Sequence, residues 1–346
     1  MLDKNSKLVI ELMYNQPNLS SKEISEGLGI DISYDTLKRI LAKLKAKNLI
    51  SSMGKGRGTT YKISVTYELF YPLNIENYFK KEQDERQVKG HFNFSLITEV
   101  LTNVDLFTKE ELQHLKKLQE EYTNNISQLS HSEYSRELER LAIDLSWKSS
   151  QIEGNTYSLL ETERLLKEQE TAEGKAKDDA TMLLNHKAAL DFIIAEPDYV
   201  TPLTLARIED IHSILIRDLG IDRNIRKRRV GILGTNYKPL DNEFQIKEAL
   251  CDMCNLVNSK KNSFEKALLL LVLISYIQAF NDGNKRTARI ISNAVLISHN
   301  YCPISFRTVN SIDYKKAMLL FYEQNNITAF KDIFINQFEF AVKTYF

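Results

Sequence analysis

A short run of polar residues carries the side chains best suited to phosphate chemistry in this sequence. Residues 278–289 read Q-A-F-N-D-G-N-K-R-T-A-R. Arg286 and Arg289 are three residues apart, a spacing that places both side chains on one face of a helix. Lys285 adds a third cation, and Asp282 supplies a carboxylate of the kind that binds Mg²⁺. This combination indicates a site for a di- or triphosphate.

The run is predicted to lie between two helices joined by a tight loop. An apolar stretch at 267–277 precedes it, and apolar residues recur at helical spacing from Arg286 to Ile297. The loop residues Asn281–Asn284 are types that tolerate left-handed backbone. A loop that opens onto a helix N-terminus exposes unpaired N–H groups and the positive end of the helix dipole, which attract anions. Phosphate groups are therefore expected where the second helix begins.

The same stretch resembles the Fic motif, H-x-F-x-[DE]-G-N-[GK]-R-x-x-R, of the Fic (Fido) family of protein AMP-transferases. The matching residues are Phe280, Asp282, Gly283, Asn284, Lys285, Arg286 and Arg289. Gln278 stands where the family has its catalytic His. The resemblance extends over about residues 132–346. It implies a mainly α fold: an all-helical Fic-type bundle with a short β-hairpin flap, preceded by a small α+β domain.

The resemblance also implies a reaction with ATP and Mg²⁺. Asp282 would hold Mg²⁺, and a cradle for the phosphates would come from Gly283, Asn284, Lys285, Arg286 and Arg289. A Ser, Thr or Tyr hydroxyl of a target protein, or of the chain itself, would attack the α-phosphate and release pyrophosphate. The family's His accepts the hydroxyl proton, whereas Gln278 can orient a hydroxyl but cannot accept its proton. Loss of a general base costs about 10²–10⁴ in rate.

Four interpretations of Gln278 remain open from the sequence. The chain is a slow AMP-transferase, or it binds nucleotide without catalysis and reports its ATP state to the N-terminal domain. It catalyses a different reaction on the same scaffold, or it is an engineered inactive His→Gln form. Autoinhibited AMP transfer is the leading hypothesis. The alternative is a degenerate Fic body that acts as a nucleotide-responsive DNA-binding regulator.

A second, shorter motif lies upstream of the first. Ser149, Glu153 and Gly154 match [ST]-x-x-x-E-[GN], which resembles the inhibitory motif of the same family. By that resemblance Glu153 pairs with Arg289 and holds it away from the ATP γ-phosphate. A carboxylate and a guanidinium form a strong two-pronged pair, so an arginine engaged in this way cannot also bind phosphate.

The flap is predicted between two core helices, in residues 223–240. The alternating and turn-forming residues Val230, Gly231, Ile232 and Tyr237 suit a short hairpin, whose edge would pair with the backbone of a target protein. A solvated basic loop is the other interpretation.

His186 and His212 are candidate replacement bases, although hydrogen-bonded helix histidines are the simpler interpretation. Cys251 and Cys254 form a lone C-x-x-C, for which helix packing is favoured over zinc.

The N-terminal 66 residues are expected to form a separate basic domain. Helices are predicted near residues 6–14, 21–28 and 33–48, followed by a hairpin with a basic, glycine-rich tip, and this order resembles a winged helix-turn-helix. Double-stranded DNA would then be contacted by Tyr34, Thr36, Lys38, Arg39, Lys43, Lys55 and Arg57. A winged helix that serves protein contacts or dimerisation is the alternative.

Charge and length agree with this organisation. The chain has 346 residues and no net charge, but residues 1–66 hold eleven Lys and Arg against six Asp and Glu, so the N-terminal domain carries +5 and the remainder −5. A helical linker region is expected at 67–130, with a solvated helix near 78–89, before the Fic-like domain at 131–346. No signal peptide or membrane span is recognised, so a cytoplasmic location is expected. A homodimer is left open.

Overall fold

The computed structural model describes residues 3–30 and 32–346, and its chain divides into two compact units. The smaller unit runs to Leu73 and also takes in Gln324–Thr328. The larger unit holds Asn74–Glu323 and Ala329–Phe346. The smaller unit therefore extends beyond the boundary expected at residue 66, and it includes five residues from near the C-terminus.

The smaller unit consists of helices and a three-stranded antiparallel sheet. Its elements are α1 (Lys4–Asn15), β1 (Leu19–Ser20), α2 (Ser21–Gly27), α3 (Tyr34–Ala46), β2 (Ile50–Met53), β3 (Thr60–Ile63) and the short α4 (Val65–Leu69). The strand order is β1-β3-β2, with Ile50 opposite Ile63 at one end of the β2–β3 pair. The three predicted helices and the hairpin are confirmed. Their apolar faces meet in one core around Val9, Ile24, Leu37, Leu41 and Leu44.

Residues 324–328 are an integral part of the smaller unit. Tyr14 Oη donates to Gln324 Oε1 at 3.3 Å. The main-chain N–H of Ile327 donates to Leu69 O at 2.9 Å, and Asn326 Nδ2 donates to the carbonyls of Glu68 and Tyr71 at 3.1 and 2.8 Å. These bonds satisfy carbonyls at the end of α4, so the unit is completed by a segment distant in sequence.

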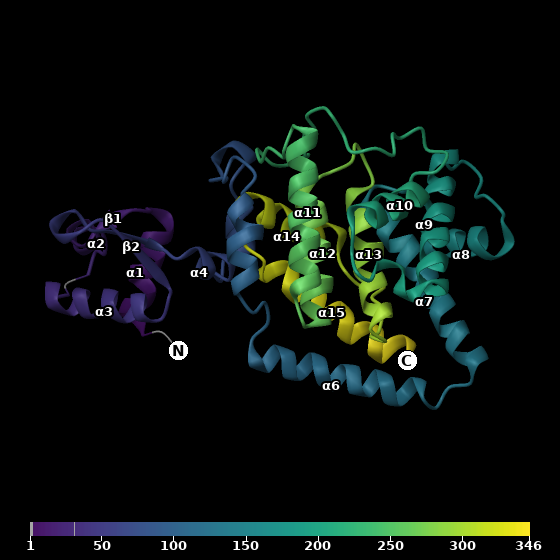
Figure 1. Ribbon diagram of the computed structural model, residues 1–346, viewed down its shortest axis with the longest axis horizontal. Coiled ribbons are helices and arrows are strands. Elements are labelled where there is room, and N and C mark those ends of the chain that lie inside the picture. Colours follow the sequence, from purple (N-terminus) through teal and green to yellow (C-terminus); the bar gives the residue numbers. More distant parts are fainter. Residues whose placement is uncertain (1–2, 31) are drawn as a thin grey trace. The chain divides into compact units, whose positions relative to one another are not determined.

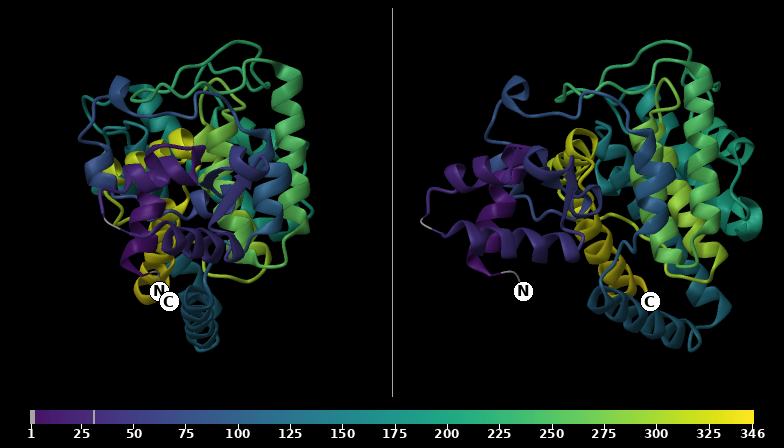
Figure 2. Two further views of the ribbon diagram at one scale, coloured as in Figure 1. Left: turned by 90° about the vertical axis from the view of Figure 1, so that its left-hand side faces the viewer. Right: turned by 60° about the vertical axis from the view of Figure 1, so that its left-hand side comes forward.

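The larger unit is a bundle of helices, shown in Figures 1 and 2. They are α5 (Ile75–Tyr78), α6 (Lys109–Ile126), α7 (His131–Ile152), α8 (Leu159–Glu168), α9 (Lys177–Ala195), α10 (Leu205–Leu215), α11 (Glu243–Ser259), α12 (Ser263–Ile277), α13 (Asn284–Ser298), α14 (Ser311–Gln324) and α15 (Thr328–Tyr345). Helices α12 and α13 lie side by side at its centre. Helix α12 is buried on every face except at Lys266, as its continuous apolar sequence predicts.

The fold class is confirmed as mainly α with a small sheet, while one local expectation is wrong. Residues 78–89 do not form a helix; a 3₁₀ turn at Gln83–Glu85 is the regular structure after α5. This segment has no wide apolar stripe to bury, and its side chains instead bond to residues far along the chain, as Gln83 Nε2 does to Asn236 Oδ1 at 2.7 Å. Among the described residues, no helix combines the length and apolar character needed to cross a membrane.

Candidate nucleotide site

Residues 278–283 of the polar run form a tight loop between α12 and α13, and residues 284–289 form the first part of α13. Gln278 ends α12 in the left-handed region (φ 52°), and Gly283 precedes α13 with φ 80°. Asn284 fastens the loop between them: its Oδ1 accepts from Phe280 N at 2.9 Å, and its Nδ2 donates to Phe280 O at 2.8 Å. The amide side chain of Asn284 therefore replaces the missing backbone bonds of the loop and fixes where α13 begins.

The N-terminus of α13 is open. No side chain caps it, and within residues 3–30 and 32–346 the main-chain N–H groups of Asn284, Lys285 and Arg286 have no hydrogen-bond acceptor. Unpaired N–H groups at a helix N-terminus form a ready anion site. This open helix end lies where the sequence predicts that an anion binds.

Arg286 is the third residue of α13 and lies within this open first turn. Its side chain is 1% exposed, and its Nη2 donates to Asp282 Oδ2 at 3.1 Å. Nε and Nη1 are buried without a partner among the described residues. Asp282 is 61% exposed at its side chain, and its Oδ1 accepts from Gly283 N at 2.6 Å. Buried donors without an acceptor are costly, so Nε and Nη1 of Arg286 are the unmet donors expected of a residue that binds phosphate.

Arg289 is fully buried and is bound from α7. Its Nε donates to Ser149 Oγ at 2.8 Å, and its Nη2 donates to Ser149 O at 3.0 Å and to Glu153 Oε1 at 2.8 Å. Nη1 has no partner in the described part of the chain. The guanidinium lies 5.3 Å from the centre of the Tyr314 ring on α14. Two of its three nitrogens are therefore already occupied by the segment that the sequence singled out.

Glu153 terminates α7 and faces two cations. Lys285 Nζ donates to its Oε2 at 3.1 Å, while Arg289 binds Oε1. Burial alone would raise the pKa of Glu153, but attraction and hydrogen bonds from Arg289 and Lys285 outweigh it and lower the pKa to about 2. Gly154 follows with φ 105°, a conformation that suits glycine. A single carboxylate thus neutralises part of the positive charge that an anion would need.

Gln278 is engaged in structural contacts. Its Nε2 donates to Ser275 O at 2.6 Å and lies 3.4 Å from the Tyr322 hydroxyl, and its Oε1 accepts from Asn284 Nδ2 at 3.3 Å. These bonds link the end of α12, the loop and α14. The side chain has no titratable group, so it cannot take up a proton.

Comparison with known proteins identifies the domain that contains this site. The profile of the Fic/DOC family matches residues 202–296, which include the loop, α13 and most of the cations described above. The chain carries a Fic/DOC domain. The sequence is 28% identical over 165 residues to "Protein adenylyltransferase Fic" of Aedes aegypti, covering 44% of this chain and 32% of that protein. It is 24% identical over 299 residues to the protein of the same name from Nematostella vectensis, covering 79% and 68%.

Solved structures show the same fold. Fic-1 of Caenorhabditis elegans (residues 134–508) matches with a TM-score of 0.59 at 20% identity, covering 68% of this chain and 72% of that one. A Fic domain-containing signaling protein of Bacteroides thetaiotaomicron matches with a TM-score of 0.56 at 21% identity, covering 66% and 94%. The chain spans about a third of the length of the Aedes relative, so the likeness extends to the helical domain and not to that whole protein.

The two histidines near the Fic loop are both buried. His212 stacks on Phe280 with ring centroids 3.6 Å apart, and its Nδ1 lies 3.2 Å from Thr287 Oγ1. Burial and then repulsion from Arg286 lower its pKa to about 3. His186 Nδ1 lies 3.3 Å from Ser146 Oγ, and burial followed by the charges of Arg289 and Arg286 holds its pKa well below the ordinary value. Buried, weakly basic rings of this kind are suited to packing and poorly suited to taking a proton from an incoming hydroxyl.

The segment expected to be the flap turns at Leu233–Gly234, but its arms form no strand ladder. We refer to residues 229–240 as the flap. Gly231 is exposed and Val230 and Ile232 are half-buried, whereas Tyr237 is buried and its hydroxyl donates to Tyr276 O at 3.2 Å. The hairpin expectation is wrong at this level: the bridge that the flap forms is parallel and joins Lys238 to His91.

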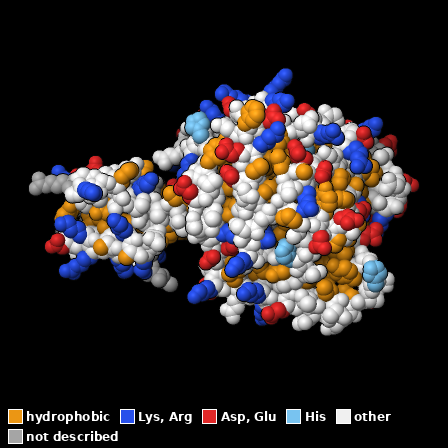
Figure 3. Space-filling view, viewed as in Figure 1, with side chains coloured by type: hydrophobic (Ala, Val, Ile, Leu, Met, Phe, Trp, Pro, Cys, Tyr) orange, Lys and Arg blue, Asp and Glu red, His pale blue; other side chains and the backbone are white. Residues whose placement is uncertain are grey.

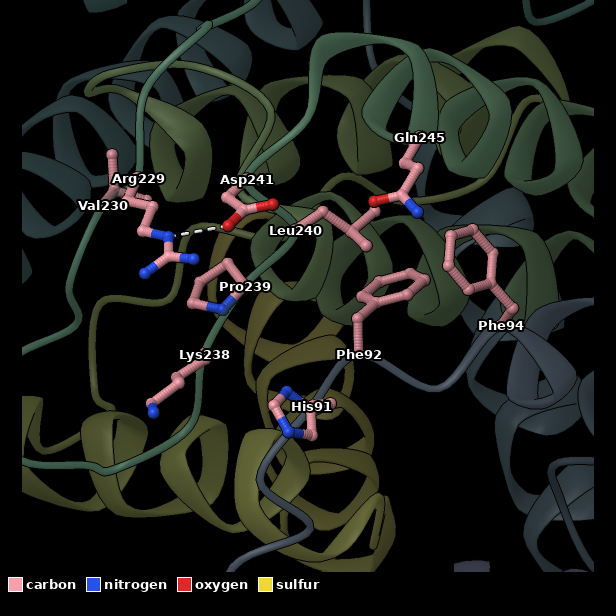
Figure 4. Close-up of a pocket in the computed structure, with 10 residues that line it drawn as sticks. All are labelled: His91, Phe92, Phe94, Arg229, Val230, Lys238, Pro239, Leu240, Asp241 and Gln245. Carbon is pink, nitrogen blue, oxygen red and sulfur yellow. Dashed lines mark hydrogen bonds and ion pairs between the residues drawn. The ribbon is translucent and has the colours of Figure 1, made fainter.

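A cavity of about 520 Å³ lies beside the flap. Figure 4 shows Phe92, Phe94 and Gln245 grouped on one side of it and the Arg229–Asp241 ion pair, at 2.6 Å, on the other. Phe92 also stacks on Tyr276, with ring centroids 4.7 Å apart. The wall of the cavity is therefore in contact with the helix that carries Gln278 at its end.

The structure also describes most residues predicted to face DNA. Tyr34, Thr36, Lys38, Arg39 and Lys43 are exposed on α3, and Lys55 is exposed before the turn that joins β2 to β3. Four of them have partners within the unit. Lys43 Nζ binds Asp3 Oδ2 at 3.0 Å, and Lys38 Nζ lies 4.6 Å from the centre of the Tyr34 ring. Tyr34 Oη lies 2.6 Å from Ser21 Oγ, and Thr36 Oγ1 lies 2.8 Å from Ser33 Oγ. The side chain of Arg57 lies outside the described part of the structure.

Cys251 is exposed and Cys254 is buried, where burial raises the pKa of its thiol to about 12. Among the described residues, no group of three or more His, Cys, Asp or Glu side chains is placed to hold a metal ion.

The contacts that sequence reasoning missed come from Arg226, Tyr314 and Tyr322. These residues belong to the surroundings of the motif in space, but they have no local pattern that marks them as part of the site.

Proposed function

We propose that this chain binds ATP with Mg²⁺ at the N-terminus of α13 and transfers AMP to a hydroxyl group of a protein. The observation that carries the proposal is the pair of buried arginines with unmet donors beneath an open helix end. Within the described residues, Arg286 Nε and Nη1 and Arg289 Nη1 are buried without partners, and three main-chain N–H groups lie at the start of the same helix. A polyphosphate supplies the negative oxygens that this set lacks.

The residues present also fit Mg²⁺. Magnesium is commonly bound by one or two carboxylates together with substrate phosphates. Asp282 is an exposed carboxylate at the helix end, and its oxygens accept hydrogen bonds from Gly283 N and Arg286. When bound, the ion would neutralise charge on the phosphates. Asp282 is the carboxylate of this chain that would hold the ion.

In the transfer, a Ser, Thr or Tyr oxygen of the target forms a bond to the α-phosphorus and the bond to the β-phosphate oxygen breaks. Pyrophosphate leaves, and the hydroxyl proton goes to water or to a phosphate oxygen because Gln278 cannot accept it. Positioning and charge stabilisation account for much of phosphoryl-transfer catalysis. The reaction is therefore slow, by about 10²–10⁴ relative to a site with a general base.

In this proposal Glu153 inhibits the reaction. Its two oxygens bind Arg289 and Lys285, two of the cations that would bind phosphate. Their donors are available to ATP only when Glu153 moves away or is removed. We therefore expect Glu153→Gly to bind Mg·ATP more tightly than the wild type.

The proposal is tested with α-labelled ATP and Mg²⁺. Wild type, Glu153→Gly, and Glu153→Gly with Gln278→His are incubated alone and with a cell lysate, and label on protein is measured. Label in Glu153→Gly supports an inhibited enzyme that works with Gln278. Label only in the double variant supports an intact pocket without its base. Failure of Glu153→Gly to bind ATP in calorimetry overturns the proposal.

A second function, nucleotide-responsive DNA binding by the smaller unit, is favoured by one topological observation. Helix α14 carries Tyr314 beside Arg289 and Tyr322 beside Gln278, and the residues at its end, Gln324–Thr328, belong to the smaller unit. The order of helices and strands in that unit is that of a winged helix-turn-helix, and Figure 3 shows Lys and Arg side chains outnumbering acidic ones on the visible face of the unit.

This second function is tested by anisotropy with a mixed-sequence DNA duplex over a series of salt concentrations, with and without Mg·ATP. Phosphate contacts by Lys38 and Arg39 would make the affinity fall steeply with salt, and charge reversal of both would flatten the slope. Lys22→Glu on α2 is the control, because Lys22 already lies 3.8 Å from Glu26 on an exposed surface. Affinity that is independent of salt would exclude this function.

A further inference from the structure

Arg226 is a buried arginine within an otherwise exposed basic segment. Its neighbours Lys227, Arg228 and Arg229 are exposed, whereas its own side chain is 1% exposed. Within the described residues it forms no ion pair with a carboxylate. A buried charge is ordinarily paired with an opposite charge, so the partners that replace a carboxylate indicate what this residue does.

Those partners are three main-chain carbonyls from three separate segments. Nε donates to Gln278 O at 2.5 Å, Nη1 donates to Arg228 O at 2.8 Å, and Nη2 donates to Leu240 O. The main-chain N–H of Arg226 donates to Ala279 O at 3.0 Å. One guanidinium therefore joins the first residue of the Fic motif to Leu240 at the end of the flap and to Arg228, the residue immediately before the flap.

The same bonds cap the C-terminus of α12. The last carbonyls of a helix have no partner within it. Here Tyr276 O accepts from the Tyr237 hydroxyl, while Gln278 O and Ala279 O accept from Arg226. A cation at the negative end of a helix is also favourable. The left-handed conformation of Gln278 directs its carbonyl to Arg226, so the backbone of the motif and the flap belong to one hydrogen-bonded network.

We propose that Arg226 is a positioning residue that sets the distance between the flap and residue 278. This inference rests on the proposed function and on the expectation that the flap pairs with the backbone of the target protein, so that the target hydroxyl reacts next to position 278. Because the guanidinium spans all three carbonyls, the flap cannot move relative to the motif without breaking one of these bonds. Its donors are directed to these carbonyls and not to the open end of α13, so its role concerns the target protein and not the nucleotide.

A lysine at position 226 would keep the positive charge but lose this geometry. Its single nitrogen donates from one point, whereas the guanidinium donates from three nitrogens in a fixed plane. Arg226→Lys should therefore fold and leave at least one flap carbonyl unbound. Arg226→Ala would leave three main-chain carbonyls without this donor and serves only as the severe variant. Arg228→Lys, at an exposed neighbouring arginine, is the matched control.

The test combines two measurements on the full chain. Hydrogen exchange followed by mass spectrometry should show faster exchange of the flap amides in Arg226→Lys, by about tenfold for the loss of one hydrogen bond, with no change in α13. Calorimetry in the Glu153→Gly background should give the same Mg·ATP affinity with and without the Arg226→Lys substitution. Arg228→Lys should change neither.

Transfer is then measured in the Glu153→Gly, Gln278→His background with α-labelled ATP and a lysate. Arg226→Lys should lower labelling by about 10²-fold, the cost of a misplaced reactant, and raise KM for protein more than KM for ATP. Unchanged flap exchange, or a loss of ATP affinity equal to the loss of labelling, overturns the positioning role. A third outcome separates the two proposals. If Arg226→Lys makes the flap exchange faster and leaves ATP binding intact, but even the parent background transfers no label, Arg226 positions the flap and AMP transfer is refuted.

Discussion

Glu153 and Arg289 meet at 2.8 Å, between the end of α7 and a fully buried position on α13. Lys285 binds the other oxygen of Glu153 at 3.1 Å. The carboxylate thus connects two helices and at the same time occupies two of the cations at the open end of α13. One residue therefore contributes both to the stability of the bundle and to the accessibility of the anion site, and the two effects can be measured separately.

Replacing Glu153 by Gln should make stability less dependent on pH in the acid range. The lowered pKa of Glu153 means that the folded state favours the charged carboxylate, so its contribution is complete above the ordinary pKa of 4.5 and is lost as pH falls toward about 2. A difference of this size corresponds to about 3 kcal/mol at neutral pH. Urea unfolding of wild type and Glu153→Gln should differ by that amount at pH 7 and converge below pH 4.5. A constant difference across this range would contradict the assignment.

His212 should make the protein sensitive to mild acid. Burial and Arg286 lower its pKa, so the unfolded state takes up the proton first as pH falls. The contribution of His212 to the free energy of unfolding is therefore complete above pH 6.5 and is lost as pH falls toward 3. The loss is about 1.4 kcal/mol per pH unit in this window. Urea unfolding at pH 7 and 5 should show a smaller drop for His212→Asn than for the wild type. His131→Asn, at an exposed histidine, should leave the drop unchanged.

The Fic loop could be predicted from sequence because its determinants are local. The left-handed Gln278, the Gly283 turn and the helix that follows lie within a few residues of one another, and the Glu153–Arg289 pair was implied by a second short motif. The exposed face of α3 followed in the same way from helical spacing. Local propensity and a contiguous motif were sufficient in each of these places.

The flap and the role of Arg226 could not be predicted for the opposite reason. Five basic residues occur from Arg223 to Arg229, and nothing local distinguishes the one that is buried. Its burial depends on where the end of α12 lies in the folded chain. The alternating sequence at 230–237 suggested strands, but no ladder forms there, and Lys238 instead forms a parallel bridge with the distant residue His91. Residues 324–328 joined the smaller unit through equally distant contacts.

The ion pair between Arg86 and Glu323 should be important for anchoring the flap. Glu323 is fully buried; its Oε1 binds Arg86 Nη2 at 3.1 Å and its Oε2 accepts from Tyr78 Oη at 2.6 Å, while Arg86 also binds Gly234 O in the flap. Glu323→Gln removes the charge that compensates Arg86, which typically costs about 3–5 kcal/mol. Urea unfolding measures this loss.

The matched control for that pair replaces both partners. Arg86→Met with Glu323→Leu leaves no buried charge, so it should destabilise the protein less than Glu323→Gln alone. Hydrogen exchange of the flap should increase in both variants. In the double variant Gly234 O loses its donor, Arg86, and in the single variant Arg86 is held less firmly. A double variant that is less stable than Glu323→Gln would show that the attraction between Arg86 and Glu323 exceeds the cost of burying their charges.

Gln278 should contribute to stability whether or not it takes part in a reaction. Its amide bonds to Ser275 O and Asn284 Nδ2, and Asn284 in turn fastens the loop through Phe280. Gln278→Ala removes both amide bonds and should cost about 1–2 kcal/mol. Gln278→His keeps a ring N–H that can donate to Ser275 O and should cost less. Urea unfolding of both variants gives the comparison, and calorimetry with Mg·ATP shows whether the loop still forms the anion site. If Gln278→Ala is as stable as the wild type and binds ATP equally well, these contacts contribute nothing to the fold, and the reason for glutamine at this position must lie in the substrate.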